Sequence, residues 1–216
     1  MNVANSYLSE HYGDILSPNT SWHEVIVCHQ VNCRGVMGAG LAKQIRNLFP
    51  MLFAEYQNQC ARSSPEELLG KTLYYDVNNH GYNYTIANIY GQVNYGHGKR
   101  FTDYDALRKA FQQIRTVTNT YLGLRPVTRI RIPYKMGCGL GGGDWNIVLQ
   151  IIHEELIEHH ILVEIRRVSY NLKCAAHAIR SGKYGLMGIY ANRVFGLTSK
   201  SKWNRGSSVA RIPIDE

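Results

Sequence analysis

A glycine-rich turn that joins an apolar run to an amphipathic segment constrains the fold of this chain more than any other feature. The apolar run, Val25 to Cys28, predicts a buried strand, and the apolar spacing from Leu41 to Phe49 predicts a helix. The turn between them contains Gly35, Gly38 and Gly40. Because glycine permits positive φ angles and close backbone approach, several N–H groups can face one point where the helix begins. This arrangement favours an anion such as phosphate.

The kind of phosphate ligand is narrowed by what the turn lacks. It has no Lys-Ser/Thr pair to hold a nucleoside triphosphate with magnesium, and its Gly-Ala-Gly differs from the dinucleotide fingerprint. His29 and Asn32 form a polar set at the end of the strand, which points to a sugar phosphate. A tight turn that binds nothing is the alternative, because many strand-to-helix turns contain such glycines.

Length and composition indicate one well-buried α/β domain with an appendage. The chain has 216 residues, of which 44% are hydrophobic, as is typical of a globular protein. No apolar run approaches the length that spans a bilayer, and the first residues have neither the basic region nor the apolar core of a secretion signal. We therefore expect a cytoplasmic protein with no membrane partner.

The cysteines indicate a reducing environment. The chain has 5 of them, an odd set without a Cys-x-x-Cys pair, which fits reduced thiols better than disulfides or a zinc site. We therefore expect no structural metal.

The net charge of +8 belongs to the last quarter of the chain. Residues 1–164 carry 14 Lys/Arg and 14 Asp/Glu, whereas residues 165–216 carry 10 and 2. Basic residues are interleaved there with aromatic ones, a composition that binds single-stranded nucleic acid through phosphate contacts and base stacking. The simpler interpretation, which we prefer, is a helical extension over residues 166–216 with a solvated basic face.

Strands and helices are predicted to alternate through the rest of the chain. We expect strands at residues 22–31, 71–77, 82–90, 127–132 and 161–165, and helices at residues 41–49, 51–62, 103–121 and 144–158. The segment up to Tyr12 is mixed and polar and favours no element. Such alternation predicts a three-layer α/β/α sandwich with a mixed central sheet over residues 1–165, followed by the basic C-terminal extension.

A second glycine cluster, Gly137 to Gly143, follows the strand expected at residues 127–132. In sheets of this kind, ligands bind beyond the carboxyl ends of the strands. Because both glycine-rich loops follow strands, we expect them to meet at the same edge of the sheet. The two loops would then form a cleft for a ligand with phosphates in its middle.

Four motifs occur in the order seen in macro domains, and in combination they make the chain resemble that family over residues 10–165. They are Gly13-Asp14-Ile15, His29-x-x-Asn32, Gly35-x-Met37-Gly38-x-Gly40-Leu41-Ala42 and Gly137-Cys138-Gly139-Leu140. The chain looks most like the phage and bacterial branch related to the yeast-type ADP-ribose 1''-phosphate phosphatases. Terminal ADP-ribose protein glycohydrolases and DNA ADP-ribosyl glycohydrolase antitoxins are close neighbours of that branch.

The resemblance implies ADP-ribose, or its 1''-phosphate, as the ligand, bound without a metal or cofactor. Asp14 matches the aspartate that accepts a hydrogen bond from the adenine amino group, with Ile15 stacking nearby, and Asn32 matches the asparagine that holds the distal ribose. Backbone groups of both loops would wrap the diphosphate. The expected substrate-binding residues are Gly13, Asp14, Ile15, Asn32, Met37, Gly38, Ala39, Gly40, Leu41, Ala42, Gly137, Cys138, Gly139, Leu140 and Gly141.

Candidate catalytic residues are implied by the same resemblance. His29 matches a histidine of the yeast-type phosphatases and would act as general acid or base, or else it is a core histidine bonded to the backbone. Asn32 would position the terminal phosphate. Asp144 would orient water, although it is also a good helix cap. His97 lies in a loop that would cover the distal ribose, unless it is simply solvent-exposed.

Departures from the neighbouring families bear on the reaction. The terminal glycohydrolases use a lysine after the strand that corresponds to residues 84–90 and an aspartate in the second glycine loop, where this chain has Ile-Tyr-Gly and Gly141. The DNA glycohydrolase antitoxins also carry a lysine in the first of these regions. These absences favour hydrolysis of a phosphate monoester, or plain binding, over either glycohydrolase reaction, and we take an ADP-ribose 1''-phosphate phosphatase as the leading hypothesis. A non-catalytic ADP-ribose reader, and a hydrolase that removes ADP-ribose from protein or nucleic acid without that lysine, remain alternatives.

Overall fold

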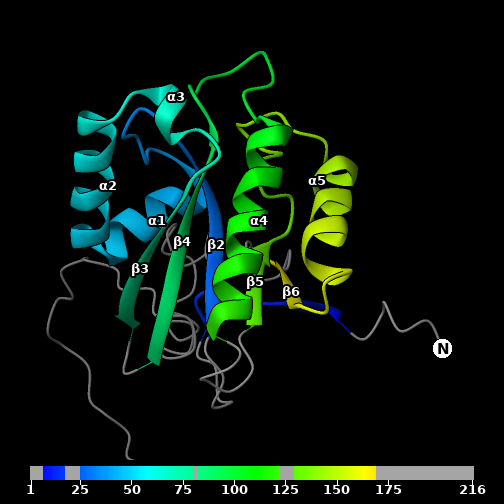
Figure 1. Cartoon of the computed structure of the whole chain (residues 1–216). Coiled ribbons are helices and arrows are strands. Elements are labelled where there is room, and N and C mark those ends of the chain that lie inside the picture. Colours follow the sequence, from blue (N-terminus) through cyan, green and yellow to red (C-terminus); the bar gives the residue numbers. More distant parts are fainter. Residues whose placement is uncertain (1–6, 18–24, 80–81, 122–128, 169–216) are drawn as a thin grey trace, which may run out of the picture. The chain divides into compact units, whose positions relative to one another are not determined.

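The computed structural model describes residues 7–17, 25–79, 82–121 and 129–168. Predictions for residues 18–24, 122–128 and 169–216, including most of the basic extension, lie outside these ranges. The strands are β1 (Leu8–Tyr12), β2 (Val25–Asn32), β3 (Thr72–Asn79), β4 (Tyr82–Gln92), β5 (Arg129–Pro133) and β6 (Leu162–Arg167). The helices are α1 (Gly40–Leu48), α2 (Pro50–Arg62), α3 (Pro65–Leu68), α4 (Tyr104–Tyr121) and α5 (Trp145–Ile152), which continues into the π-helical η2 (His153–Ile157) (Figure 1).

The described strands form one mixed sheet in the order β1-β6-β5-β2-β4-β3. β3 pairs antiparallel with β4, and every other neighbouring pair is parallel. The carboxyl ends of β2, β4 and β5 therefore lie at the same edge, which is where ligands bind in open α/β sheets.

Alternate residues of β2 pack on opposite faces of the sheet. Ile26 and Cys28 belong to the core shared with α4 and α5, whereas Val25 and Val27 belong to the core shared with α1 and α2. Figure 1 shows these two helix pairs on either side of the strands. A strand covered on both faces needs apolar residues at successive positions, which explains the unbroken apolar run. The predicted three-layer sandwich with a mixed central sheet is confirmed.

β1 occupies the segment for which the sequence favoured no element. Its last three residues are exposed, so no apolar alternation marks it as a strand. The strand exists because it pairs in parallel with β6, with Leu8 opposite Val163. A partner this distant in the sequence leaves no local signal.

The predicted helices are present, with differences at the start of α2, at α3 and after Ile152. Pro50 is the first residue of α2, where its missing N–H removes no hydrogen bond. The unpredicted α3 follows at once, because Ser64 accepts from the N–H of Glu67 while the Glu67 carboxylate accepts from the N–H of Ser64. None of the helices in the described ranges is long and apolar enough to cross a bilayer.

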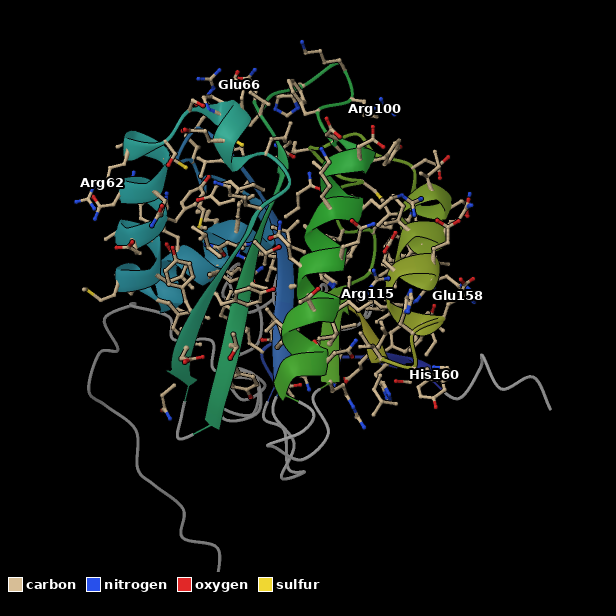
Figure 2. The ribbon with its side chains drawn as sticks, viewed as in Figure 1. Arg62, Glu66, Arg100, Arg115, Glu158 and His160 are labelled. Atoms are coloured by element: carbon tan, nitrogen blue, oxygen red, sulfur yellow. The ribbon has the colours of Figure 1, made fainter. Side chains whose placement is uncertain are left out.

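The helix predicted over residues 144–158 changes to π-helix after Ile152. Within η2, Glu155 is 6% exposed and accepts hydrogen bonds from Arg108, Gln112 and Arg115 of α4. Figure 2 shows Arg115 on the side of α4 that faces this segment. The buried carboxylate thus ties the two helices on this face together.

Candidate functional site: a pocket between two glycine-rich loops

A pocket of about 520 Å³ lies beyond the carboxyl ends of β2, β4 and β5. Its wall comes from the end of β2, the turn into α1, the loop after β4 and the second glycine-rich loop. The lining residues are His29, Gln30, Val31, Asn32, Val36, Gly38, Ala39, Gly40, Leu41, Ala42, Gln92, Tyr95, Gly96, His97, Pro133, Tyr134, Lys135, Met136, Gly137, Gly139, Leu140 and Gly141. The two glycine-rich loops therefore meet, as the sequence predicted.

The side chain of Asn32 organises the turn after β2. Its Nδ2 donates to the carbonyl of Val36 at 2.6 Å, and its Oδ1 accepts from the N–H groups of Arg34 (2.9 Å) and Val36 (3.3 Å). The Tyr56 hydroxyl of α2 donates to the same Oδ1 at 3.0 Å and to the Asn32 carbonyl at 2.7 Å. One amide thus shapes the turn that forms the pocket wall. Its contact with a ribose stays a prediction.

The first turn of α1 lines the pocket and contains N–H groups without a partner in the described ranges. Ala39, its N-cap, has no side chain that can accept a hydrogen bond, and the first turn contains no acidic residue. The N–H groups of Gly40, Leu41 and Ala42 have no hydrogen-bond partner in the described part of the chain. In contrast, Asp144 caps α5. Unpaired N–H groups at the positive end of a helix form an anion-binding site.

The second glycine-rich loop is held from the side of α4. The carbonyl of Gly141 accepts from the N–H groups of Phe101 (2.8 Å) and Thr102 (2.9 Å), and the Thr102 hydroxyl donates to the carbonyl of Gly137 at 2.7 Å. The N–H groups of Gly139 and Gly141 make no hydrogen bond with other described residues. Both of the loops that line the pocket therefore contain N–H groups without a partner among the described residues.

Part of the predicted site lies outside the pocket wall. In the turn after β1, the Asp14 carboxylate accepts from the N–H of Leu16 at 2.9 Å. The Asp144 carboxylate accepts from the N–H of Asn146 at 2.8 Å and caps α5, which confirms the structural alternative for it. Adenine binding by Asp14 and water orientation by Asp144 stay predictions. The predicted residues that do not line the pocket are Gly13, Asp14, Ile15, Met37, Cys138 and Asp144.

His29 is 2% exposed and lines the pocket from β2. Its Nε2 lies 2.5 Å from Oδ1 of Asn88, the residue opposite it on β4. An oxygen acceptor at this distance assigns the ring proton to Nε2, which leaves Nδ1 as a lone pair without a partner among the described residues. Burial lowers the pKa of His29 to about 4, although the bond to Asn88 opposes the shift. The ring is therefore uncharged near neutral pH, and its Nδ1 lone pair is a weak proton acceptor because burial disfavours the charged ring.

The lowered pKa of His29 predicts a loss of stability in mild acid. The folded pKa of about 4 lies below the ordinary 6.5, so the unfolded chain binds more protons than the folded chain between these pH values. The contribution of His29 to stability is therefore fully present above pH 6.5 and is lost as the pH falls toward 4. We expect this residue to contribute a loss of about 2 kcal/mol between about pH 7 and about pH 5. Urea denaturation of wild type and His29→Gln at both pH values measures it. An unchanged pH dependence in the variant contradicts the assignment.

The described residues of the pocket wall include no carboxylate and only one lysine or arginine, Lys135. Among the lining residues, His97 in the loop after β4 was predicted from the sequence, whereas Tyr95 of the same loop, and Tyr134 and Lys135 directly after β5, were not. The only sequence feature that could have marked Tyr95, Tyr134 and Lys135 is that each follows a predicted strand. Nowhere in the described ranges do three or more metal-ligating side chains come together.

Comparison with known proteins agrees with this geometry. Residues 28–152 match the family model of the macro domain. An ADP-ribose 1''-phosphate phosphatase of Chaetomium globosum is 33% identical over 73 residues, which are 34% of this chain and 38% of that protein. A DNA ADP-ribosyl glycohydrolase of Mycobacterium tuberculosis is 30% identical over 139 residues, which are 64% of this chain and 35% of that protein. The matches thus span little more than a third of each relative.

A solved structure shares the architecture over a longer range. A protein of unknown function from Bacteroides thetaiotaomicron superposes with a TM-score of 0.64 and is 27% identical. The match covers 74% of this chain and 98% of that one. Nearly the whole of that protein therefore has the fold described for this chain.

Proposed function

This chain belongs to the macro domain family, and from that premise we propose that it binds ADP-ribose and hydrolyses the phosphate monoester of ADP-ribose 1''-phosphate. The observation that carries the proposal is the pocket lined by two glycine-rich loops whose N–H groups are partly unpaired among the described residues. No carboxylate of the described residues lines this pocket, so its wall does not repel an anion. These features support a diphosphate held by backbone hydrogen bonds.

The proposed reaction transfers the terminal phosphoryl group to water. The bond between phosphorus and the ribose oxygen breaks, a bond from phosphorus to the water oxygen forms, and the proton lost by water ends on the ribose oxygen. His29 Nδ1 is the proposed proton acceptor, because it is a lone pair without a partner among the described residues, on a side chain that lines the pocket. The fungal relative, whose name states this phosphatase activity, supports the choice of substrate.

Removal of ADP-ribose from nucleic acid is the second candidate. The mycobacterial relative named for that activity matches 139 residues of this chain, almost twice the length of the fungal match. The pocket also contains a lysine, although Lys135 enters from the loop after β5 and not from the position implied for glycohydrolases.

The two candidates release different products. Purified protein is incubated with ADP-ribose 1''-phosphate and, separately, with ADP-ribosylated DNA and ADP-ribosylated protein, while phosphate and ADP-ribose are quantified. We expect phosphate from the first substrate. We also expect His29→Gln to slow its release at least about tenfold, because the amide can keep the contact with Asn88 but cannot accept the proton.

Three outcomes would change the proposal. ADP-ribose release from DNA without phosphate release would favour the second candidate. Calorimetric binding of ADP-ribose without any product would make the protein a reader. Phosphate release that survives His29→Gln unchanged would remove His29 from the mechanism.

A further inference from the structure

We propose that Lys135 is a ligand-binding residue whose ammonium group neutralises the diphosphate of the bound nucleotide. The inference rests on the proposed binding of ADP-ribose and adds a side-chain contact to the backbone clamp. The position of Lys135 along the sheet edge, the charges of the pocket and the backbone conformation of this residue support the contact.

The strand order places Lys135 between the two ends of the expected ligand. Asp14, the adenine candidate, follows β1, and Asn32, the distal-ribose candidate, ends β2. Lys135 follows β5, which lies between β1 and β2 in the sheet. The part of ADP-ribose between adenine and the distal ribose is the proximal ribose with its diphosphate. Lys135 therefore lies where the ligand carries its charge.

The charges around the pocket leave this ammonium group available. Lys135 is the only lysine or arginine among the described lining residues, and none of the described carboxylates forms an ion pair with it. Its Nζ lies 5.5 Å from the ring centroid of Tyr134. The Arg167 guanidinium lies closer to that ring centroid, at 3.6 Å. Because an arginine already stacks on Tyr134, contact with this ring does not explain why residue 135 is a lysine.

The backbone of Lys135 gives an independent indication. Its φ is +59°, in the left-handed region that costs little for glycine or asparagine and more for lysine. Strain of this kind is concentrated at functional sites, where the side chain repays it. A lysine in a backbone conformation that suits glycine therefore indicates a functional role for its ammonium group.

The same conformation makes a clean test feasible. Lys135→Gly removes the charge but relieves the backbone, so its melting temperature should equal or exceed that of wild type. We expect Lys135→Gly and Lys135→Met to bind ADP-ribose about tenfold more weakly than wild type at low salt, equivalent to about 1.4 kcal/mol. Added salt should reduce this difference, because it screens the wild-type attraction. Lys135→Arg should stay within about threefold, because it keeps the charge.

Lys99 provides the matched control. Its Nζ lies 5.3 Å from the ring centroid of Phe101, and the residue does not line the pocket. It stands in the segment between β4 and α4. Lys99→Met removes the same charge and a similar aromatic contact, and we expect wild-type affinity.

The dissociation constants, measured by calorimetry, separate the outcomes. Wild-type affinity in Lys135→Gly and Lys135→Met overturns the inference while leaving the proposed function intact. Equal losses in Lys99→Met and Lys135→Met also overturn it, because they would reflect general attraction and not a contact. Failure of the wild type to bind ADP-ribose would instead remove the proposed function on which the inference rests.

Discussion

Replacing Gly141 with alanine is expected to abolish ADP-ribose binding, with a loss of affinity of at least about 100-fold, or about 2.7 kcal/mol. A Cβ at this position would lie 2.5 Å from the carbonyl oxygen of Gly137 and 2.5 Å from the Thr102 hydroxyl. Neither atom is the end of a flexible chain that can move aside. The second glycine-rich loop must therefore shift, and the N–H groups that it presents to the pocket shift with it.

Gly139 in the same loop is the control for this prediction. A Cβ there would meet no atom within 4 Å, so Gly139→Ala should keep the melting temperature of wild type, whereas Gly141→Ala should lower it. Calorimetric titration of ADP-ribose together with thermal unfolding measures both effects. Wild-type affinity in Gly141→Ala would show that the loop does not hold the ligand.

Substitution of Arg131 by methionine is expected to destabilise the protein by about 3 kcal/mol. Arg131 is 1% exposed, and its Nη1 donates to the carbonyls of Ile15 (2.8 Å) and Ser17 (3.1 Å) in the turn after β1. Its Nε lies 3.5 Å from the buried carboxylate of Glu164. Burial lowers the pKa of Arg131, and Glu164 opposes that shift. Methionine would leave two carbonyls without this donor and would remove one of the cations beside a buried anion.

Arg129 tests whether burial is the cause. It projects from the same strand toward Glu164, but its Nη1 is 3.7 Å away and its side chain is 35% exposed. Arg129→Met should therefore cost less than about 1 kcal/mol, since exposed ion pairs contribute little. The free energies of unfolding come from urea denaturation near neutral pH. Similar losses in the two variants would contradict the argument.

The sequence predicted those elements whose signals are local. The apolar run of β2, the spacing of Leu107, Phe111 and Ile114 in α4, and Asp103, whose carboxylate accepts from the N–H of Ala106 in the first turn of α4, are each recognisable within a few residues. β1 and the change to π-helix in η2 were not predictable in this way. β1 depends on pairing with β6, and no local pattern in the sequence marked the end of regular α-helix after Ile152.

In the candidate site, too, some features could be predicted from the sequence and others could not. Both glycine-rich loops and their meeting at one sheet edge followed from glycine positions after strands. The hydrogen bond from Tyr56 to Asn32 and the burial of His29 against Asn88 did not, because they depend on α2 and β4, which lie farther along the chain. The structure therefore changes the emphasis at His29, from a group that donates or accepts a proton to a neutral acceptor.

By itself, the sequence determined where the backbone turns and which segments are apolar, because glycine conformation and side-chain periodicity are properties of neighbouring residues. It thereby predicted two glycine-rich loops that suit a phosphate group and a three-layer sandwich that resembles the macro domain. Only the tertiary structure decided which N–H groups stay unpaired and which charges reach the pocket. The position of the charge depends on β5 lying between β6 and β2, because this pairing brings Lys135 to the same wall as Asn32 across about a hundred residues of chain.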